Sequence, residues 1–509
     1  MGNIQTRKTQ LGRIGLTCGL ALLMVLTGCG GSSGGNSSNQ PSAPAHGGQI
    51  SVAGLGTNES VTLENNSGNA VTIAANGVAN FPASWTTTAN YLITVKSHTP
   101  NLTCAATQAS GSLDAAEALV SVSCSPGSKT DLYSFDGQYA VNPNLPTAGV
   151  IVDNAGNLYG TTFSGGSGGN GVVFKLSAGA QGSYQLTNLS EATIFTGPTP
   201  EATGQLWIDN AGALYGVETN GGDNNLGSVF KLIPNASGTY DKVTLYSFRD
   251  NGDGAHPYGG VVQDQAGNLY GATSRWTASS TIYKLSPTSA TTYGFSVLHT
   301  LDPTTEGDNI LGRLVLDQSG NLYGVANQGG SPNDAGSAFR VTPSGQLTVL
   351  HTFPTGNNDG AGPMGSLTLD AAGNLYGTTT GGGTSSKGTV FKLSADGHGG
   401  YTESVLYSFA GLPDGEMPST GVVLDNMGNL FGATTNGGDQ GRGVVYRLTP
   451  NGQNGYDETV LYSIATPASP SGYHGGTSYG ELFLDSSGNL FGTTVNDGAN
   501  NYGSVFLIN

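Results

Sequence analysis

The sequence DNAGNLYGTT, residues 153–162, returns six more times further along the chain with small changes. The shared pattern is Asp-x-x-Gly-Asn-Leu-Tyr/Phe-Gly, and the second copy departs from it because Ala213 replaces the Asn. Consecutive copies begin 53 to 60 residues apart, so the repeating unit holds about 55 residues. The first residues of the seven copies are Asp153, Asp209, Asp264, Asp317, Asp370, Asp425 and Asp485.

Each unit has the length and the pattern of four short β-strands, which in the fifth copy are residues 366–370, 375–380, 389–394 and 404–409. The motif is the turn between the first two strands. Its Asp can accept hydrogen bonds from the following amides, and its Gly can adopt a positive φ. Four strands per repeat are typical of a propeller blade. We therefore expect an all-β fold with a seven-bladed β-propeller, in which the repeated Asp has a structural role.

The order of the strands predicts how this propeller closes. The chain ends on GSVFLIN, residues 503–509, which is a third strand with no fourth strand after it. An unmatched fourth strand, LYSF at residues 132–135, precedes the first unit. We expect this early segment to pair with the last strand and so remove its open edge.

Residues 131–509 resemble the GloVer tandem-repeat family, whose members are also described as choice-of-anchor proteins. The resemblance is carried by the long repeated phrase LYSF…DG…P…G…D-x-x-GNLYGTT…GG…G-T-V-F-K-L. It implies a secreted or surface-attached protein, and it implies no particular enzymatic activity.

The N-terminus is typical of a signal peptide over residues 1–28, with a basic start and an apolar run at 14–26 that is too short to cross a bilayer comfortably. Residues 26–29, LTGC, resemble the bacterial lipoprotein box, which implies a lipid on Cys29. The alternative is an ordinary secretory signal with an incidental cysteine. By analogy with such lipoproteins, the absence of Asp after Cys29 favours the outer membrane, with the protein periplasmic or surface-exposed. Residues 29–48 are rich in Gly and Ser and predict a flexible tether.

Residues 49–125 alternate apolar and polar side chains in several short runs separated by Gly, Asn and Pro. This pattern predicts a small β-sandwich, and the segment resembles the immunoglobulin-like modules of bacterial surface lipoproteins. Cys104 and Cys124 are the two cysteines left once residues 1–29 are set aside, and an oxidising compartment favours a disulfide between them. Two separate buried thiols are the alternative.

The charge of the chain is strongly acidic, with a formal net charge of −17. Removing residues 1–28 takes away three of the 17 basic residues and none of the 34 acidic ones, which leaves −20. A basic surface for nucleic acid is therefore not expected.

Candidate ligand positions lie in the loops that join one unit to the next and in those between the second and third strands, because these loops surround one mouth of a propeller channel. Repeated Asp-Gly pairs in these loops could hold a divalent cation such as calcium, although a turn is the commoner role of Asp-Gly. Residues that break the repeat are further candidates. The full set is Asp253, His256, Arg275, Trp276, Asp359, Asp414 and Glu481.

These observations favour a lipid-anchored cell-surface binding or scaffold protein for a glycan, a peptide or another protein. We expect no catalytic residues and no cofactor from the sequence. One alternative is a propeller enzyme of the lyase or lactonase type with a metal at the channel mouth. The other is a purely structural envelope protein.

Overall fold

The computed structural model describes residues 48–508 apart from short internal gaps, of which the longest are 83–89, 192–203 and 465–479. Every regular element within the described residues is a β-strand, which confirms the all-β prediction. No helix in this part of the chain is long and apolar enough to span a bilayer. The predicted signal peptide and Cys29 lie outside the described residues.

The first eight strands form two four-stranded sheets. In β2 the side chains alternate between buried and partly exposed, as expected for a strand with one face on a core. The buried side chains of both sheets form one hydrophobic cluster that includes Ile50, Val61, Leu63 and Val120. One sheet contains β4 (Gly77–Asn80), β1 (Gly48–Ala53), β8 (Ala118–Pro126) and β6 (Leu102–Thr107), and the other contains β3 (Ala70–Ile73), β2 (Val61–Asn65), β5 (Asn90–His98) and β7 (Ser110–Ser112).

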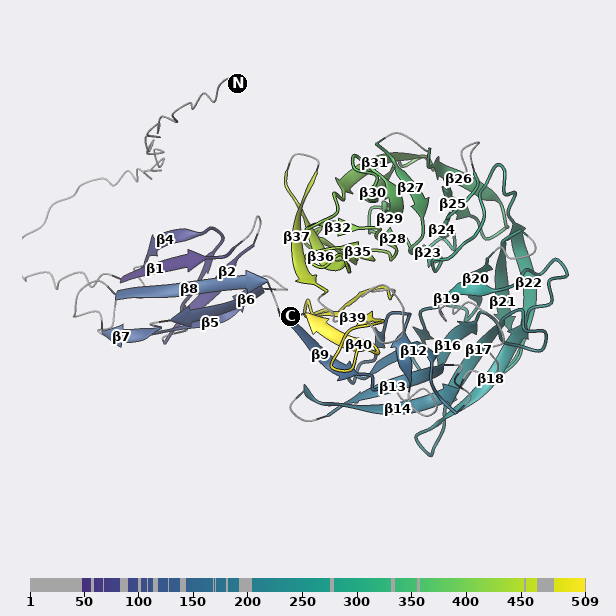
Figure 1. The fold of residues 1–509 in the computed structure, drawn as a ribbon, viewed down its shortest axis with the longest axis horizontal. Helices are drawn as coiled ribbons and strands as arrows, with labels where there is room; N and C mark the ends of the chain where they lie inside the picture. The colour runs from purple at the N-terminus through teal and green to yellow at the C-terminus, as the bar shows by residue number, and fades with distance from the viewer. Residues whose placement is uncertain are drawn as a thin grey trace, which may run out of the picture. The chain divides into compact units, whose positions relative to one another are not determined.

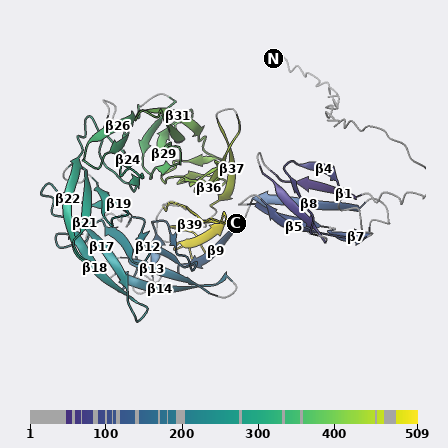
Figure 2. The ribbon, with the colours of Figure 1, turned by 180° about the vertical axis from the view of Figure 1, so that it is seen from behind.

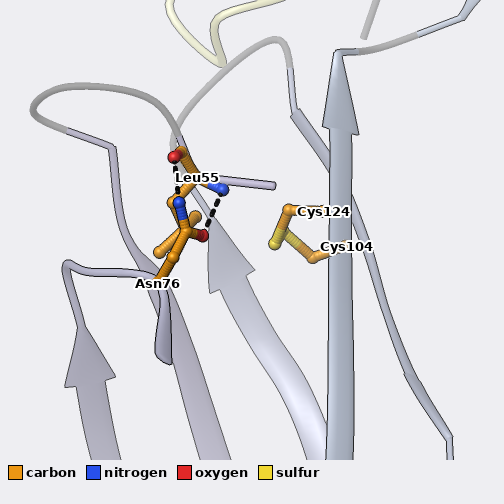
Figure 3. The surroundings of a disulfide bond; sticks show 4 residues. All are labelled: Leu55, Asn76, Cys104 and Cys124. Atoms are coloured by element: carbon orange, nitrogen blue, oxygen red, sulfur yellow. Dashed lines mark hydrogen bonds between the residues drawn. A yellow bond between two sulfur atoms is a disulfide. The ribbon is translucent and has the colours of Figure 1, made fainter. Parts of the chain in front are cut away.

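A disulfide joins Cys104 of β6 to Cys124 of β8, the pair that the sequence suggested (Figure 3). The two residues lie directly opposite each other in the antiparallel register, with their Cα atoms 4.1 Å apart. Nearby, the amide of Asn76 exchanges two hydrogen bonds with the backbone of Leu55, at 2.7 and 2.8 Å. The disulfide therefore fastens two neighbouring strands whose register the ladder already sets.

From residue 129 onward, the described strands form seven sheets of four or five strands with one common order, here called repeat sheets 1–7, and one small two-stranded sheet (Figures 1 and 2). Sheet 1 contains β10 (Asn144–Pro146), β11 (Ile151–Val152), β12 (Leu158–Ser164), β13 (Val172–Ala178) and β14 (Tyr184–Glu191). Sheet 2 contains β15 (Trp207–Ile208), β16 (Leu214–Glu218), β17 (Ser228–Pro234) and β18 (Tyr240–Ser247). Sheet 3 contains β19 (Pro257–Gln263), β20 (Leu269–Thr273), β21 (Thr281–Pro287) and β22 (Tyr293–Thr300). Sheet 4 contains β23 (Val315–Leu316), β24 (Leu322–Ala326), β25 (Ser337–Val341) and β26 (Leu347–Thr352).

The remaining three sheets follow the same order. Sheet 5 contains β27 (Gly360–Pro363), β28 (Thr368–Leu369), β29 (Leu375–Gly382), β30 (Thr389–Ala395) and β31 (Tyr401–Ser408). Sheet 6 contains β33 (Val423–Leu424), β34 (Leu430–Ala433), β36 (Val444–Pro450) and β37 (Tyr456–Ser463), beside the small pair β32 (Gly415–Glu416) and β35 (Asn436–Gly437). Sheet 7 contains β38 (Phe483–Leu484), β39 (Leu490–Thr494), β40 (Ser504–Ile508) and β9 (Lys129–Ser134).

Sheet 7 confirms the predicted pairing of the early strand with the end of the chain. The strand β9 runs antiparallel to β40, with Tyr133 opposite Val505 and Lys129 opposite Ile508. The early strand begins three residues sooner than the sequence suggested, at Lys129. Sheet 7 therefore has four strands in the common order, although Lys129 on β9 and its partner Asp497, just after β39, lie 368 residues apart along the chain.

The core of each repeat sheet is built on a glycine and an aromatic ring. In sheet 5, Gly377 of the motif lies opposite Phe391 of the third strand, and a Cβ at position 377 would lie 2.6 Å from the ring. A larger residue would therefore displace the ring from the core. The same opposition recurs in every repeat sheet, and the seven buried rings are Phe174, Phe230, Tyr283, Phe339, Phe391, Tyr446 and Phe506.

Candidate functional site

Both oxygens of the carboxylate in the repeated turn accept hydrogen bonds from the turn itself, as Asp370 shows. Its Oδ1 accepts the backbone amides of Ala372 and Asn374, at 2.9 and 2.8 Å. Its Oδ2 accepts the side-chain amide of Asn374 at 2.8 Å and the hydroxyl of Tyr376 at 3.2 Å. Burial alone would raise the pKa of Asp370, but these hydrogen bonds to the charged form outweigh it and lower the pKa.

This network accounts for the conserved letters of the motif within the chain. The Asp binds the turn, the Asn and Tyr bind the Asp, and Gly373 takes φ +85°. Copies of the motif that lack the Asn or the Tyr also lack the corresponding hydrogen bond to the Asp. Ala213 has no side-chain amide to donate, and Phe431 has no hydroxyl. The same amide bonds to Oδ1 occur at Asp153, Asp209, Asp264, Asp317, Asp370, Asp425 and Asp485.

The three Asp residues of the joining loops bind back to the preceding fourth strand. Asp253 accepts the hydroxyl of Tyr246 at 2.7 Å, and Asp414 accepts that of Tyr407 at 3.2 Å. Asp359 instead contacts the imidazole of His351 at 3.0 Å. The fourth strand is the far end of each sheet from the inner strand, so these carboxylates do not line the central cavity described below.

The other predicted candidates lie in different places. His256 is buried, takes φ +53°, and has its Nδ1 3.0 Å from the carbonyl oxygen of Thr219. Burial lowers the pKa of this imidazole, so it stays neutral as a packed residue of the loop. Glu481 lines the central cavity. Arg275 and Trp276 lie outside the described residues.

A cavity of about 300 Å³ opens where the first strands of five repeat sheets converge. Its lining includes apolar residues of these inner strands, among them Val423 and Phe483. The polar side chains around it come from sheets far apart in the sequence. They are Gln205, Arg313, Ser366, Thr368 and Glu481.

Hydrogen bonds and ring contacts hold several of these side chains in place. The Ser366 hydroxyl accepts the backbone amide of Arg313 at 2.8 Å, and the Ser366 amide donates to Oε1 of Glu481 at 3.0 Å. The guanidinium carbon of Arg313 lies 5.9 Å from the centre of the Trp207 ring, a cation–π distance. Sheets 4, 5 and 7 are thus linked through the residues that line the cavity.

Close approach of the inner strands explains the glycine before each lining residue. A Cβ at Gly312 would lie 2.7 Å from the backbone of Gly365, and a Cβ at Gly365 would lie 2.1 Å from the amide nitrogen of Gly421. Only glycine permits backbones to meet this closely. The residue directly after the glycine then faces the cavity. It is Gln205, Arg313, Ser366 or Glu481, depending on the repeat.

The sequence reasoning found Glu481 but missed Gln205, Arg313 and Ser366. A signal for them exists: in copies 2, 4, 5 and 7 the residue four positions before the turn Asp varies freely, while its neighbours keep a Gly-x-apolar pattern. When the side chain at one repeat position differs from copy to copy, the copies together can bind a single ligand that has no internal symmetry. The lining of the cavity therefore contains one cation, one anion, one side-chain amide and two hydroxyls, together with apolar side chains.

Solved structures that are similar to this chain at low identity include one enzyme and two bacterial extracellular domains. A luciferin-regenerating enzyme has a TM-score of 0.38 at 14% identity, over 60% of this chain and 90% of that chain. Two come from B. thetaiotaomicron. One is the extracellular domain of a protein described as a hybrid two-component system, with a TM-score of 0.44 at 12% identity, over 84% of this chain and 44% of that chain. The other is the extracellular domain of a protein described as a one-component system, with a TM-score of 0.43 at 12% identity, over 74% of this chain and 40% of that chain. The present chain thus spans less than half the length of either extracellular domain.

No curated protein matches the sequence. The family model of the Gloeobacter/Verrucomicrobia repeat matches residues 101–334 and 310–509, which together cover most of the chain. This match confirms the resemblance that the repeated phrase suggested. The chain belongs to the Gloeobacter/Verrucomicrobia repeat family.

Proposed function

We propose that the protein is a lipid-anchored binding or scaffold module of the bacterial cell envelope, and that its repeat sheets form a closed seven-bladed propeller with a ligand site in the central cavity. The observation that carries the binding role is the set of unlike polar side chains that converge on the cavity, Gln205, Arg313, Ser366 and Glu481. Ring closure is supported by β9, which completes sheet 7, and by the bond from the Thr493 hydroxyl to the carbonyl of Ala148 at 3.1 Å.

The ligand class that this cavity favours is a compact polar molecule, either a glycan or a short peptide. The Arg313 guanidinium can donate to a carboxylate or to hydroxyl oxygens, and the Glu481 carboxylate can accept from hydroxyl or amino groups. The apolar side chains of the lining, such as Val423 and Phe483, can pack against a sugar ring or an aliphatic side chain. A scaffold role follows if the bound group belongs to another envelope protein.

The described lining favours this role over a metal-dependent lyase or lactonase. Such an enzyme would place several oxygen or nitrogen ligands from different blades around one point. Here the lining contains a single carboxylate, Glu481, and one of its oxygens already accepts the Ser366 amide. An outer-membrane location with lipid on Cys29 is part of the proposal, and it rests on the resemblance of residues 26–29 to a lipoprotein box.

A glycan and peptide array, probed with the full chain, tests the proposal. We expect at least one ligand whose affinity falls about tenfold or more in Arg313→Gln and in Glu481→Gln, because each variant removes a charge from the cavity. Arg249→Gln is the matched control, since Arg249 is exposed two residues after the outer strand β18 ends and should not affect binding.

Two results would contradict the proposed site. One is a ligand whose binding is unchanged in both cavity variants, which would move the site elsewhere on the molecule. The other is the lack of any ligand on the arrays, which would favour the purely structural envelope role.

A further inference from the structure

The outer strands of the repeat sheets share one register position whose chemistry changes from sheet to sheet. In sheet 5 this position is Glu403, which lies opposite Leu393 of the third strand. In sheets 3, 5 and 7 the residue at this position lies against the fourth strand of the preceding sheet, where it meets Tyr246, His351 and Tyr462 respectively. Across sheets 1–7 the position holds Leu186, Lys242, Phe295, Leu347, Glu403, Glu458 and Lys129.

At most of these junctions the side chain complements its surroundings. Lys129 lies 2.7 Å from Asp497 and 2.5 Å from Asp131, so the ammonium balances two carboxylates. Phe295 stacks on Tyr246 of the preceding sheet, with ring centres 3.9 Å apart. In sheet 7 a cation thus balances nearby carboxylates, and in sheet 3 a ring packs on the preceding sheet.

The junction between sheets 4 and 5 brings two carboxylates and an imidazole together instead. Nε2 of His351, on β26, lies 3.0 Å from Oδ2 of Asp359 in the joining loop. Glu403 on β31 completes the group, and one ligand atom from each residue lies within 4.8 Å of the other two. Oε1 of Glu403 is shielded from solvent and has no hydrogen-bond partner among the described residues.

We propose that His351, Asp359 and Glu403 bind one divalent transition-metal ion, best matched by zinc, at the junction of sheets 4 and 5. This site is separate from the central cavity, because it lies between two outer strands rather than among the inner ones.

The donor set selects the metal class. One imidazole nitrogen and two carboxylate oxygens are a three-ligand set suited to four-coordinate zinc, with water in the fourth position. Calcium would need six to eight oxygen ligands, which this group does not offer. Ligand atoms around a zinc ion lie about 3.3 Å apart, given bonds of about 2 Å. Small side-chain rotations would therefore bring atoms now within 4.8 Å into place.

A bound metal would act as a cross-link between neighbouring sheets. It would join the outer strand β26 to the outer strand β31 and hold the loop that carries Asp359 between them. It would also place a positive charge between two carboxylates that otherwise repel each other at a shielded position. The metal would thus do at this junction what Lys129 does in sheet 7.

Two related junctions in the same chain each lack one of the three metal ligands, so they show what the site requires. Nε2 of His299 lies 2.8 Å from Oε2 of Glu306, but the third position there is Leu347, which cannot bind a metal. At the junction of sheets 5 and 6, Asp414 and Glu458 meet a phenol, Tyr407, in place of the imidazole. Only the junction of sheets 4 and 5 combines all three ligands among the described residues.

The test uses the full chain in detergent, freed of metal with a chelator that is then removed. Zinc chloride is titrated by calorimetry, and cobalt(II) chloride is titrated by visible absorption, which reports a four-coordinate site. We expect one metal ion per chain. His351→Tyr and Glu403→Leu should each weaken binding at least about tenfold, because each removes a direct ligand.

These variants are chosen so that the fold survives, since Tyr407 and Leu347 occupy the equivalent positions in neighbouring sheets. His299→Tyr is the matched control and should bind zinc like the unmodified chain. The proposal is overturned if the unmodified chain binds no equivalent of zinc at micromolar concentrations. It is equally overturned if His351→Tyr and Glu403→Leu bind as tightly as the control.

Discussion

The hydroxyl of Tyr376 donates one hydrogen bond to the turn carboxylate of Asp370. Other copies of the motif in the same chain lack this hydroxyl and can be compared with it. In copies 6 and 7 the motif has Phe431 and Phe491 at this position, so those turns hold their shape with one bond fewer. The hydroxyl therefore adds to the stability of the turn but is not needed for its conformation.

From this comparison we expect Tyr376→Phe to fold normally and to lower the free energy of unfolding by about 1 kcal/mol, the usual net value of one such hydrogen bond. Asp370→Ala should cost more, about 2 kcal/mol or above, because it leaves the turn amides without their acceptor. Urea unfolding followed by tryptophan fluorescence measures both. Equal losses in the two variants would show that the turn does not depend on the carboxylate.

The carboxyl group of Glu458 makes stability depend on pH in a defined direction. Burial, together with the nearby Asp414 carboxylate, raises the pKa of Glu458 to about 7, from an ordinary value of 4.5. The folded protein therefore holds this proton more tightly than the unfolded chain does. Its contribution to stability is present at low pH and is lost as the pH rises from about 4.5 to about 7.

We expect Glu458→Gln to lose less stability than the unmodified protein between pH 5 and about pH 7.5, because the amide carries no proton to release. Melting temperatures measured across this range by circular dichroism give the comparison. The groups that face Glu458 are Asp414, Tyr407 and Tyr446, and both phenols have raised pKa values, so they stay neutral throughout this range. An identical pH profile in the variant would contradict the raised pKa.

At the scale of the element, β9 completes the last repeat sheet from a distant part of the chain. It pairs with β40 from Lys129 to Ser134, and Phe135 directly after it is buried in a cluster with Phe174 and Val505. Without β9, the strand β40 would have an unpaired edge at the end of the last sheet.

Deleting residues 131–135 should therefore lower the melting temperature of the repeat sheets by more than about 5 °C. Deleting residues 49–53, which form most of β1 in the first module, is the control and should leave the transition of the repeat sheets in place. Differential scanning calorimetry resolves the two transitions. If deletion of β9 leaves the melting temperature unchanged, the strand does not hold the last sheet.

At the scale of the whole molecule, the proposed anchor determines where the acidic protein is displayed. Each buried acyl methylene contributes about 0.8 kcal/mol of membrane affinity, so the two or three chains of a lipoprotein would hold the protein firmly. With the predicted signal removed, the chain would carry a net charge of −20, so its overall charge would not favour binding to an anionic membrane.

We accordingly expect the unmodified protein to partition into the detergent phase of Triton X-114 and Cys29→Ser to partition into the aqueous phase. Expression in a bacterial host with an intact lipoprotein pathway is needed for this comparison. Cys18→Ser is the matched control, because Cys18 lies within the predicted signal and should not change the partition. An unmodified protein that is already aqueous would refute the anchor.

Much of the architecture follows from local patterns that repeat. The spacing of the Asp motifs predicts the number of units, and the alternation of apolar and polar residues predicts the strands, because both depend on neighbouring residues alone. The unmatched strands at residues 132–135 and 503–509 predict the pairing of β9 with β40, because sheet edges tend to be filled.

Which residues group together in each site could not be predicted in the same way. Gln205, Arg313 and Glu481 are far apart in the sequence, and they meet because glycine lets the inner strands of different sheets approach one another. His351, Asp359 and Glu403 meet because two outer strands and a loop pack side by side, whereas the sequence had grouped Asp359 with the channel mouth. A repeat in the sequence can predict the strands of one sheet, because each strand depends on the pattern of residues within it. Which side chains from different sheets converge depends on how the sheets pack against each other, and that only the tertiary structure decides.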